Sequence, residues 1–144
     1  MQSFPHQYRV AARAGSEGEV ALDSAGLPPL ASAGPAEFGG PGDRWSPETL
    51  LVGAVADCYV LSLRAVAEAS KVAWTSIDCR AEGTLDRVER TTRFTQVALH
   101  VELVVPPETE LAKAERVLEK AKSACLISNS LACPVTLEKS VRQA

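Results

Sequence analysis

The chain has 144 residues, of which 46% are hydrophobic and 23% are charged, proportions typical of a soluble globular protein. This length suits a single domain, residues 1–144, that is large enough to bury a core. The formal net charge is −3 and the basic residues are scattered among acidic ones, so the composition excludes a basic surface for nucleic acid.

The sequence shows neither the pattern of a signal peptide nor that of a membrane-spanning segment. The first fifteen residues, "MQSFPHQYRVAARAG", contain no continuous apolar segment of the kind found in signal peptides. The longest apolar stretch, about 50–63, is interrupted by Asp57 and is shorter than the ~20 residues that a membrane span needs. We therefore expect a cytoplasmic protein whose four cysteines are thiols at rest. No two of them form a CxxC pair, which disfavours a structural zinc site.

Alternation near the N-terminus predicts a β-hairpin. Tyr8, Val10 and Ala12 share one face of a strand, "AGSEGE" provides the turn, and residues 20–22 return as the partner strand. The segment 23–43 that follows is rich in Gly, Pro, Ala and Ser. Because loops of this length are uncommon in compact domains, we expect it to be functional, partly ordered as a short strand, or wrapped around a partner.

A long helix is predicted to follow this loop. Ser46 suits the N-cap position, Pro47 the first helical position, and Glu48 the positive end of the helix dipole. The next fifteen positions are apolar on nearly every face, which is typical of a helix enclosed by protein on all sides. A chain this small cannot easily surround one helix, so we expect a second copy of the chain to cover part of it.

Two strands are predicted after the helix, with "DRVERTT" as the turn between them. One face of the first strand carries Ile77, Cys79, Ala81, Gly83 and Leu85. One face of the second carries Val97, Leu99, Val101, Leu103 and Val105. Both strands therefore present an apolar face to a common core.

The C-terminal third predicts an amphipathic helix and a closing strand. "PPE" at 106–108 ends the preceding strand, "SNS" at 128–130 ends the helix, and "PVTLEKSV" alternates as a strand. The apolar stripe of the helix consists of Leu111, Ala114, Leu118, Ala121 and Cys125. The order of elements predicts an α+β fold in which an antiparallel sheet packs on a central apolar helix.

Cys58 and Cys125 share one property, because each lies on the apolar face of a predicted helix. If these two faces pack together, the two thiols meet in an apolar pocket, within disulfide reach where their Cα atoms lie less than ~7 Å apart. The alternative is that both are buried core residues, since free cysteine behaves as a small hydrophobe. The pattern alone leaves both interpretations open.

Four segments resemble the OsmC/Ohr family, the osmotically inducible protein C and organic hydroperoxide resistance proteins. "SPETLLVGAVADCYVLSL" resembles the "NPE…C" helix of that family, and "AKSACLISNSLACPVTL" its second-cysteine segment. "SIDCRAEGTLDRV" and "VALHVELVVP" continue the match, so the resemblance covers roughly residues 46–141. It implies the OsmC-like fold, with antiparallel sheets packed on the long helix and an intertwined homodimer.

The resemblance also implies a function, in which Cys58 is the peroxidatic nucleophile and Cys125 the resolving thiol. Cys58 would be oxidised to a sulfenic acid by an organic hydroperoxide, which is released as the alcohol, and Cys125 would then form a disulfide with it. No metal or organic cofactor is implied. The partners implied are a second copy of the chain and a dithiol reductant, either a lipoylated protein or a thioredoxin-like protein.

The family stabilises its thiolate with an arginine held by the glutamate of the "PE" motif, here Glu48. This chain departs from that pattern because its hairpin turn contains no arginine; Arg13 and Arg44 are the candidates, and Arg44 is chosen because it is close to Glu48. Positions 48 and 58 are about 15 Å apart along a straight helix, at ~1.5 Å per residue, so Glu48 acts on Cys58 only through an intermediary or across a dimer interface.

Two further departures lie beside the cysteines. Asp57 places a carboxylate next to the nucleophile, where it opposes thiolate formation unless it is paired. Leu126 stands where the family usually has a proline after the second cysteine.

The remaining candidates favour structural roles. Cys79 is expected in the core, and Cys133 is expected to be structural or an alternative resolving thiol. His100 lies on the polar face of its strand with no second histidine nearby, which disfavours a Cys-His hydrolase. Two alternatives to a peroxidase stay open: an OsmC-fold protein that binds an apolar ligand or senses redox state, and a structural dimer without chemistry.

Overall fold

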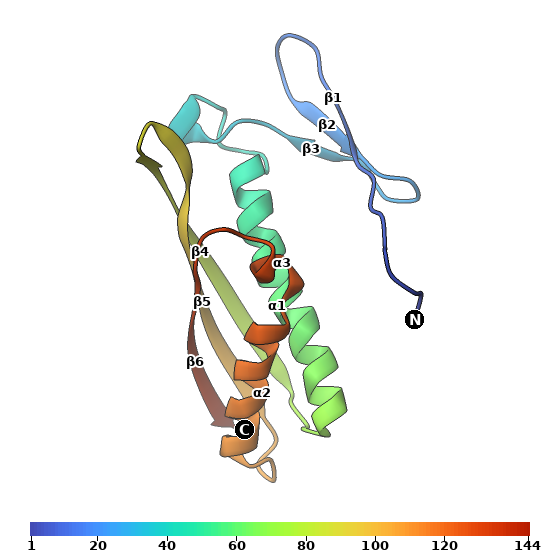
Figure 1. The fold of residues 1–144 in the computed structure, drawn as a ribbon, viewed down its shortest axis with the longest axis vertical. Coiled ribbons are helices and arrows are strands. Elements are labelled where there is room, and N and C mark those ends of the chain that lie inside the picture. Colours follow the sequence, from blue (N-terminus) through green and yellow to red (C-terminus); the bar gives the residue numbers. More distant parts are fainter. The chain divides into compact units, whose positions relative to one another are not determined.

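The structure is a computed structural model that describes all 144 residues. The chain forms two compact units, residues 1–50 and 51–144, and the boundary falls in the first turn of the long helix (Figure 1). Each unit contains its own three-stranded sheet. The expectation of one domain over residues 1–144 stays a prediction.

The N-terminal unit is a small antiparallel sheet in the order β1-β2-β3. Its strands are β1 (Ala11–Arg13), β2 (Val20–Asp23) and β3 (Leu30–Ser32). The predicted hairpin is present, but its first strand is shorter than predicted, because Tyr8 and Val10 precede β1 and are exposed. The long loop is partly ordered, as one of the three expectations had it, because it contains β3 and a short 3-10 helix, η1 (Ala36–Phe38).

Helix α1 (Pro47–Ser70) begins where the capping residues predict. The Ser46 hydroxyl accepts a hydrogen bond from the Thr49 backbone N–H at 3.1 Å. The Ser46 backbone N–H in turn donates to the Thr49 hydroxyl at 2.8 Å. This reciprocal pair satisfies two backbone donors that the first turn of a helix leaves free, as a capping box does.

The C-terminal unit is built on a sheet in the order β4-β5-β6. Strands β4 (Ser76–Val88) and β5 (Thr91–Val105) are antiparallel and joined by Glu89 and Arg90, whose φ angles are 50° and 70°. Positive φ at both central residues is typical of tight hairpin turns that match the twist of the strands. The turn is therefore much shorter than the predicted "DRVERTT", because the polar residues on either side of it pair across the hairpin.

One pairing in this sheet differs from the expected antiparallel arrangement. Strand β6 (Val135–Gln143) runs parallel to β5, from Val97 opposite Val135 to Val105 opposite Gln143. Parallel neighbours need a crossover connection, and here helix α2 (Leu111–Ala124) and the short helix α3 (Leu126–Asn129) supply it. The α+β fold class is confirmed, and all other strand pairs are antiparallel.

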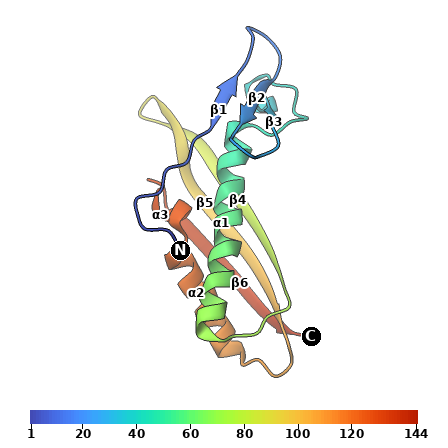
Figure 2. The same ribbon diagram turned by 90° about the vertical axis from the view of Figure 1, so that its right-hand side faces the viewer.

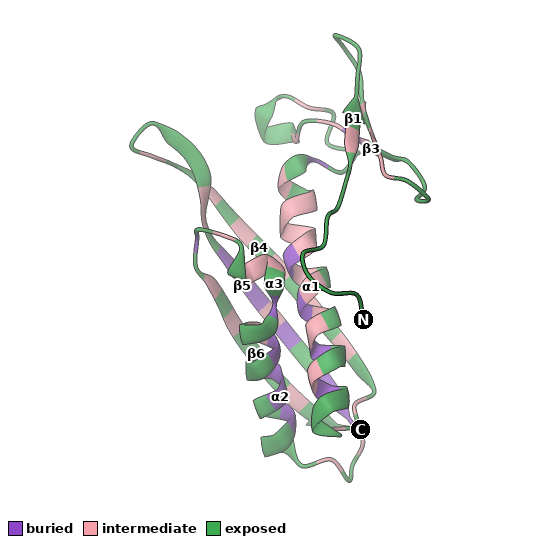
Figure 3. Ribbon diagram, turned by 45° about the vertical axis from the view of Figure 1, so that its right-hand side comes forward, coloured by how far each residue is buried: buried purple, intermediate pink, exposed green.

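The core lies between the β4-β5-β6 sheet and helices α1 and α2, which cover the same face of the sheet (Figures 1 and 2). Figure 3 shows that the buried residues of both helices form a stripe along each helix. In α1 this stripe consists of Val55, Tyr59, Leu63 and Ala67, and in α2 of Ala114, Val117, Leu118 and Ala121. Leu111, which was expected in the α2 stripe, is exposed because it stands at the first residue of the helix.

Helix α1 is less enclosed in this protomer than its composition suggests. By length and composition it could cross a membrane, but it packs on the sheet as a core helix. Of its most apolar 18-residue segment, 22% is buried. A second stripe, made of Leu51, Ala54, Cys58, Leu61 and Ala65, is only partly covered or exposed. The expected enclosure on every side is therefore absent from the single chain.

Gly83 of β4 marks the closest approach of the sheet to α1. A Cβ atom at this position would lie 2.6 Å from Cγ2 of Val52 and 2.8 Å from Cε1 of Phe94. Overpacking of this kind costs ~1–3 kcal/mol. We expect Gly83→Ala to lower the free energy of unfolding by about this amount in chemical denaturation. Gly34→Ala is the matched control, since nothing lies within 4 Å of its Cβ position; equal losses in both variants would contradict the close contact.

Candidate active site

Cys58 lies in the middle of α1, one residue before the buried Tyr59. Its side chain is half-buried and packs against the core cluster. Tyr59 faces the core directly, and its hydroxyl donates a 2.9 Å hydrogen bond to the Leu118 carbonyl of α2. This bond joins the two helices beside the thiol and sets the rotation of α1, which places Cys58 at the edge of the buried stripe.

Cys125 lies between helices α2 and α3, not inside a helix as predicted. Helix α2 ends at Ala124, and Cys125 has an extended backbone with φ −67° and ψ 102°. Its side chain is fully buried, and its Sγ lies 4.0 Å from the backbone carbonyl oxygen of Val55 in α1. The break in the helix therefore turns the Cys125 sulfur toward the part of α1 that carries Cys58.

The Cys58 and Cys125 thiols are both free, and they are close enough for Cys58 to affect the pKa of Cys125. Each is also next to a serine. The Ser128 hydroxyl donates to Cys125 Sγ at 3.2 Å, and the Ser62 hydroxyl lies 4.0 Å from Cys58 Sγ. The arrangement is a row of four polar groups, Ser128, Cys125, Cys58 and Ser62, within an apolar surrounding.

Burial raises the pKa of the Cys125 thiol, and the hydroxyl and backbone N–H of Ser128 act in the opposite direction. The neighbouring Cys58 raises the pKa of Cys125 further, because a negative charge there holds the Cys125 proton in place. Cys125 is consequently a thiol in the resting protein at neutral pH. It can act as a hydrogen-bond donor to a Cys58 thiolate.

The two other cysteines do not join this pair. Cys79, in β4, packs partly buried against the core, and burial raises the pKa of its thiol to about 11. Cys133 is buried in the loop before β6. The interpretation of Cys79 as a core residue is confirmed, and the role of Cys133 as an alternative resolving thiol stays a prediction.

The structure does not bring Arg44 to Glu48. The Arg44 Nε donates to Glu19 Oε2 at 2.8 Å, and its Nη1 lies 3.8 Å from Asp43 Oδ2. One carboxylate oxygen of Glu48, Oε2, is buried without a hydrogen-bond partner. The other candidate arginine, Arg13, pairs with Asp23 across the first hairpin. Glu48 therefore has the unpaired oxygen that a cation would satisfy, and the protomer supplies none.

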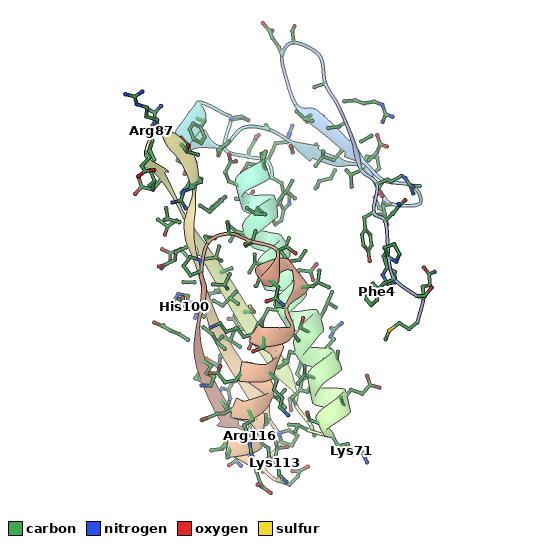
Figure 4. All side chains as sticks on the ribbon, viewed as in Figure 1. Phe4, Lys71, Arg87, His100, Lys113 and Arg116 are labelled. Atoms are coloured by element: carbon green, nitrogen blue, oxygen red, sulfur yellow. The ribbon has the colours of Figure 1, made fainter.

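The remaining singled-out residues lie away from the thiols or in solvent. Asp57 is exposed, and so is Leu126. His100 Nδ1 lies 3.0 Å from Glu138 Oε2 in the neighbouring strand. Figure 4 shows His100 on the side of the sheet away from the helices. His100 is thus separated from both thiols by the sheet, as its position on the polar face predicts.

Ser62 and Ser128 are the site residues that reasoning from the sequence missed. Ser62 follows Cys58 by one helical turn, so its spacing could have identified it. Ser128 was read as part of the segment that ends the second helix. Because a new helix starts after Cys125, Ser128 is the third residue of that helix and Cys125 is its N-cap residue. The side chain of an N-cap residue lies close to the third helical residue.

Comparisons with known proteins bear on this site. A family model described as OsmC-like protein matches residues 40–139, which include both thiols. "Uncharacterized protein YmaD" of Bacillus subtilis is 27% identical over 72% of this chain and 71% of its own length. "Peroxiredoxin OsmC" of Escherichia coli is 31% identical over 65% of this chain and 64% of its own.

The fold is also found among solved structures. A crystal structure of an organic hydroperoxide resistance protein OsmC from Legionella pneumophila superposes with a TM-score of 0.76 and 28% identity. The match covers 96% of this chain and 98% of that one. The α+β arrangement of a long helix and two small sheets is therefore the OsmC-like fold, as the resemblance implied.

Proposed function

The chain belongs to the OsmC-like protein family, and we propose that it is a cysteine-based peroxidase that reduces organic hydroperoxides to alcohols. The observation that carries the proposal is the meeting of the Cys58 and Cys125 thiols between α1 and the α2–α3 break. A half-buried thiol next to a fully buried one is the arrangement that a nucleophile and its resolving partner require. The names of the relatives from E. coli and L. pneumophila support the same class of reaction.

The proposed cycle uses only the two sulfurs. The Cys58 thiolate attacks the O–O bond of the hydroperoxide, forms a sulfenic acid and releases an alkoxide, which takes up a proton to become the alcohol. Cys125, as a thiolate, attacks the sulfenic sulfur, and hydroxide leaves and is protonated to water. A dithiol reductant then returns two electrons by thiol–disulfide exchange and restores both thiols. We place this cycle in the cytoplasm, with a lipoylated or thioredoxin-like protein as the reductant.

The environment of the pair supports an organic substrate. The core cluster that contains Cys125, and against which Cys58 packs, is made of aliphatic and aromatic side chains apart from Cys125 and Cys133. An alkyl group entering this surrounding is removed from water, with a gain of ~25 cal/mol per Å² of apolar surface. Hydrogen peroxide has no such group, so the surroundings favour organic hydroperoxides over it.

A second candidate function is an OsmC-fold protein that binds an apolar ligand or senses redox state, with little peroxidase activity. The pairing of Arg44 with Glu19 favours this candidate, because it leaves the thiols without the cation that the family uses. The close approach of Cys58 to Cys125 favours the peroxidase. The two functions differ in the rate at which the thiols consume hydroperoxide, which the following experiment measures.

Addition of cumene hydroperoxide to the wild-type protein should remove two thiols per chain and produce one equivalent of alcohol. Cys58→Ser should abolish the reaction, because it lacks the nucleophile. Cys125→Ser should stop at a Cys58 sulfenic acid that a dimedone-type probe labels. Cys79→Ser is the control and should react like wild type. Equal, slow consumption of peroxide by wild type, Cys58→Ser and Cys125→Ser would contradict the peroxidase and favour the binding protein.

Arg44 and Glu48 are the proposed activating pair, and the unpaired Oε2 of Glu48 supports a cation at that carboxylate. We expect Arg44→Ala to slow the reaction of Cys58 with hydroperoxide about tenfold, because loss of a nearby positive charge disfavours the ionised nucleophile. Stopped-flow measurement of the first step checks this. Arg13→Ala, which removes an arginine paired with Asp23, is the matched control. An unchanged rate in Arg44→Ala would remove Arg44 from the site.

We further propose that the protein is a homodimer in which α1 is covered by a second copy. The second stripe of α1, which contains Leu61, supports this. Leu61 is an apolar side chain near the middle of the helix, yet it is 52% exposed in the single chain. Cys58 belongs to the same stripe, so the second copy would lie beside the site and line the approach to its sulfur. Apolar faces of this kind are typical of obligate interfaces.

Sedimentation should give a mass of twice the 15.3 kDa protomer for the wild-type protein. Leu61→Asp should shift the equilibrium to the monomer, because it places a charge in the apolar interface. Leu126→Asp, which changes an exposed leucine in α3 that is no part of the α1 stripe, should leave the dimer intact. A monomeric wild type, or equal dissociation in both variants, would contradict the proposed interface.

A further inference from the structure

The contact between Ser128 and Cys125 has no role in the cycle described above. Cys125 stands at the N-cap position of α3, and Ser128 is the third residue of that helix. The Ser128 hydroxyl donates to Cys125 Sγ at 3.2 Å, whereas the Ser62 hydroxyl lies 4.0 Å from Cys58 Sγ. The buried sulfur therefore has the shorter of the two contacts with a hydroxyl.

The titratable groups near the Cys125 sulfur come from two elements, Cys58 and Tyr59 from α1 and Cys79 from β4. Burial raises the pKa values of Tyr59 and Cys79, so both are neutral when the protein works near neutral pH. No lysine or arginine is among the groups that shift the pKa of Cys125. Ser128 supplies both interactions that favour its thiolate, one from its hydroxyl and one from its backbone N–H.

We propose that Ser128 is a positioning residue that stabilises negative charge on the Cys125 sulfur and thereby controls the resolving step of the cycle. This inference rests on the proposed peroxidase function. In resolution, Cys125 loses its proton to water and its thiolate attacks the Cys58 sulfenic acid; the S–S bond forms, the S–O bond breaks and hydroxide leaves. A hydroxyl already directed at the sulfur favours the form that attacks, since hydrogen bonds to charged groups are stronger than those to neutral ones.

The same contact gives a direction to the reduction of the disulfide. Cys125 is fully buried and Cys58 is half-buried, so a dithiol reaches the Cys58 sulfur first. Its attack forms a mixed disulfide on Cys58, and the S–S bond breaks with its electron pair on Cys125. Ser128 stabilises this leaving thiolate, and better-stabilised thiolates leave faster. One hydroxyl thus acts in the two steps in which Cys125 carries charge.

The test compares Ser128→Ala, Ser128→Thr and Ser130→Ala. Ser130 is the matched control, because it follows α3 and its hydroxyl donates to the Leu126 carbonyl at 2.8 Å, away from the thiols. After rapid mixing with cumene hydroperoxide, a sulfenic-acid probe follows the oxidation of Cys58, and quenched alkylation with mass spectrometry follows disulfide formation.

We expect Ser128→Ala to oxidise Cys58 at the wild-type rate but to form the disulfide about tenfold more slowly. The pH midpoint of disulfide formation should rise by about one unit, because less Cys125 is ionised at a given pH. Reduction of the oxidised protein by dihydrolipoamide should slow as well. Ser128→Thr, which keeps the hydroxyl, should restore both the rate and the pH profile, and Ser130→Ala should match wild type.

A second measurement is independent of peroxide. In Cys58→Ser, the pH dependence of Cys125 alkylation, followed by mass spectrometry of the peptide that contains it, gives the pKa of this thiol separately from those of Cys79 and Cys133. Adding Ser128→Ala should raise this pKa by about one unit relative to adding Ser130→Ala. A wild-type pH profile in Ser128→Ala, or an unchanged Cys125 pKa, overturns the role of Ser128 alone. Failure of the wild-type protein to form any Cys58 sulfenic acid overturns the peroxidase function and this inference with it.

Discussion

The packing of α1 against the β4-β5-β6 sheet determines the position of the Cys58 thiol. The buried stripe of α1 and the hydrogen bond from Tyr59 to Leu118 set the rotation of the helix. Since Cys58 immediately precedes Tyr59, that rotation leaves it at the border between the core and the partly covered face. A rotation of α1 by one residue would bury Cys58 in place of Tyr59 and remove it from any substrate. The location of the Cys58 thiol is therefore a consequence of core packing.

The break between α2 and α3 is the second determinant, because it gives the two thiols different environments. A continuous helix would carry position 125 past α1, whereas the extended backbone at Cys125 directs its sulfur back toward Val55. The same break starts a new helix, whose third residue, Ser128, reaches the sulfur. Cys125 thus combines complete burial with a polar contact, and Cys58 combines partial access with an apolar surrounding. This asymmetry is consistent with the proposed roles of Cys58 as nucleophile and Cys125 as resolving thiol.

Charge is the part of the candidate site that the single chain leaves unpaired. The thiols have serine neighbours and no basic side chain among the groups that shift the Cys125 pKa. Glu48 has a buried oxygen without a partner, and Arg44 is engaged by Glu19 and Asp43. The partly covered stripe of α1 is likewise unsatisfied in a single chain. A second copy of the chain would explain both features. It could supply a hydrogen-bond partner to the buried carboxylate oxygen and an apolar surface to the exposed face of α1.

The sequence by itself determined the local structure, including the N-cap at Ser46, the strands on either side of the second hairpin, the amphipathic second helix and the two cysteine segments. These follow from periodicity and capping, which act between residues close in the chain. Only the tertiary structure decided the parallel pairing of β6, the helix end at Ala124, the contact between Cys58 and Cys125, and the partners of Arg44 and Ser128. Each of these features depends on groups that are brought together by packing. Val55 and Cys125, which are far apart in the chain, are an example. A local sequence pattern therefore does not encode them. Ser128 was missed for the same reason, because its hydroxyl becomes part of the site only when the backbone turns it toward the Cys125 sulfur. Ser62 differs, since its spacing of one helical turn from Cys58 is visible in the sequence.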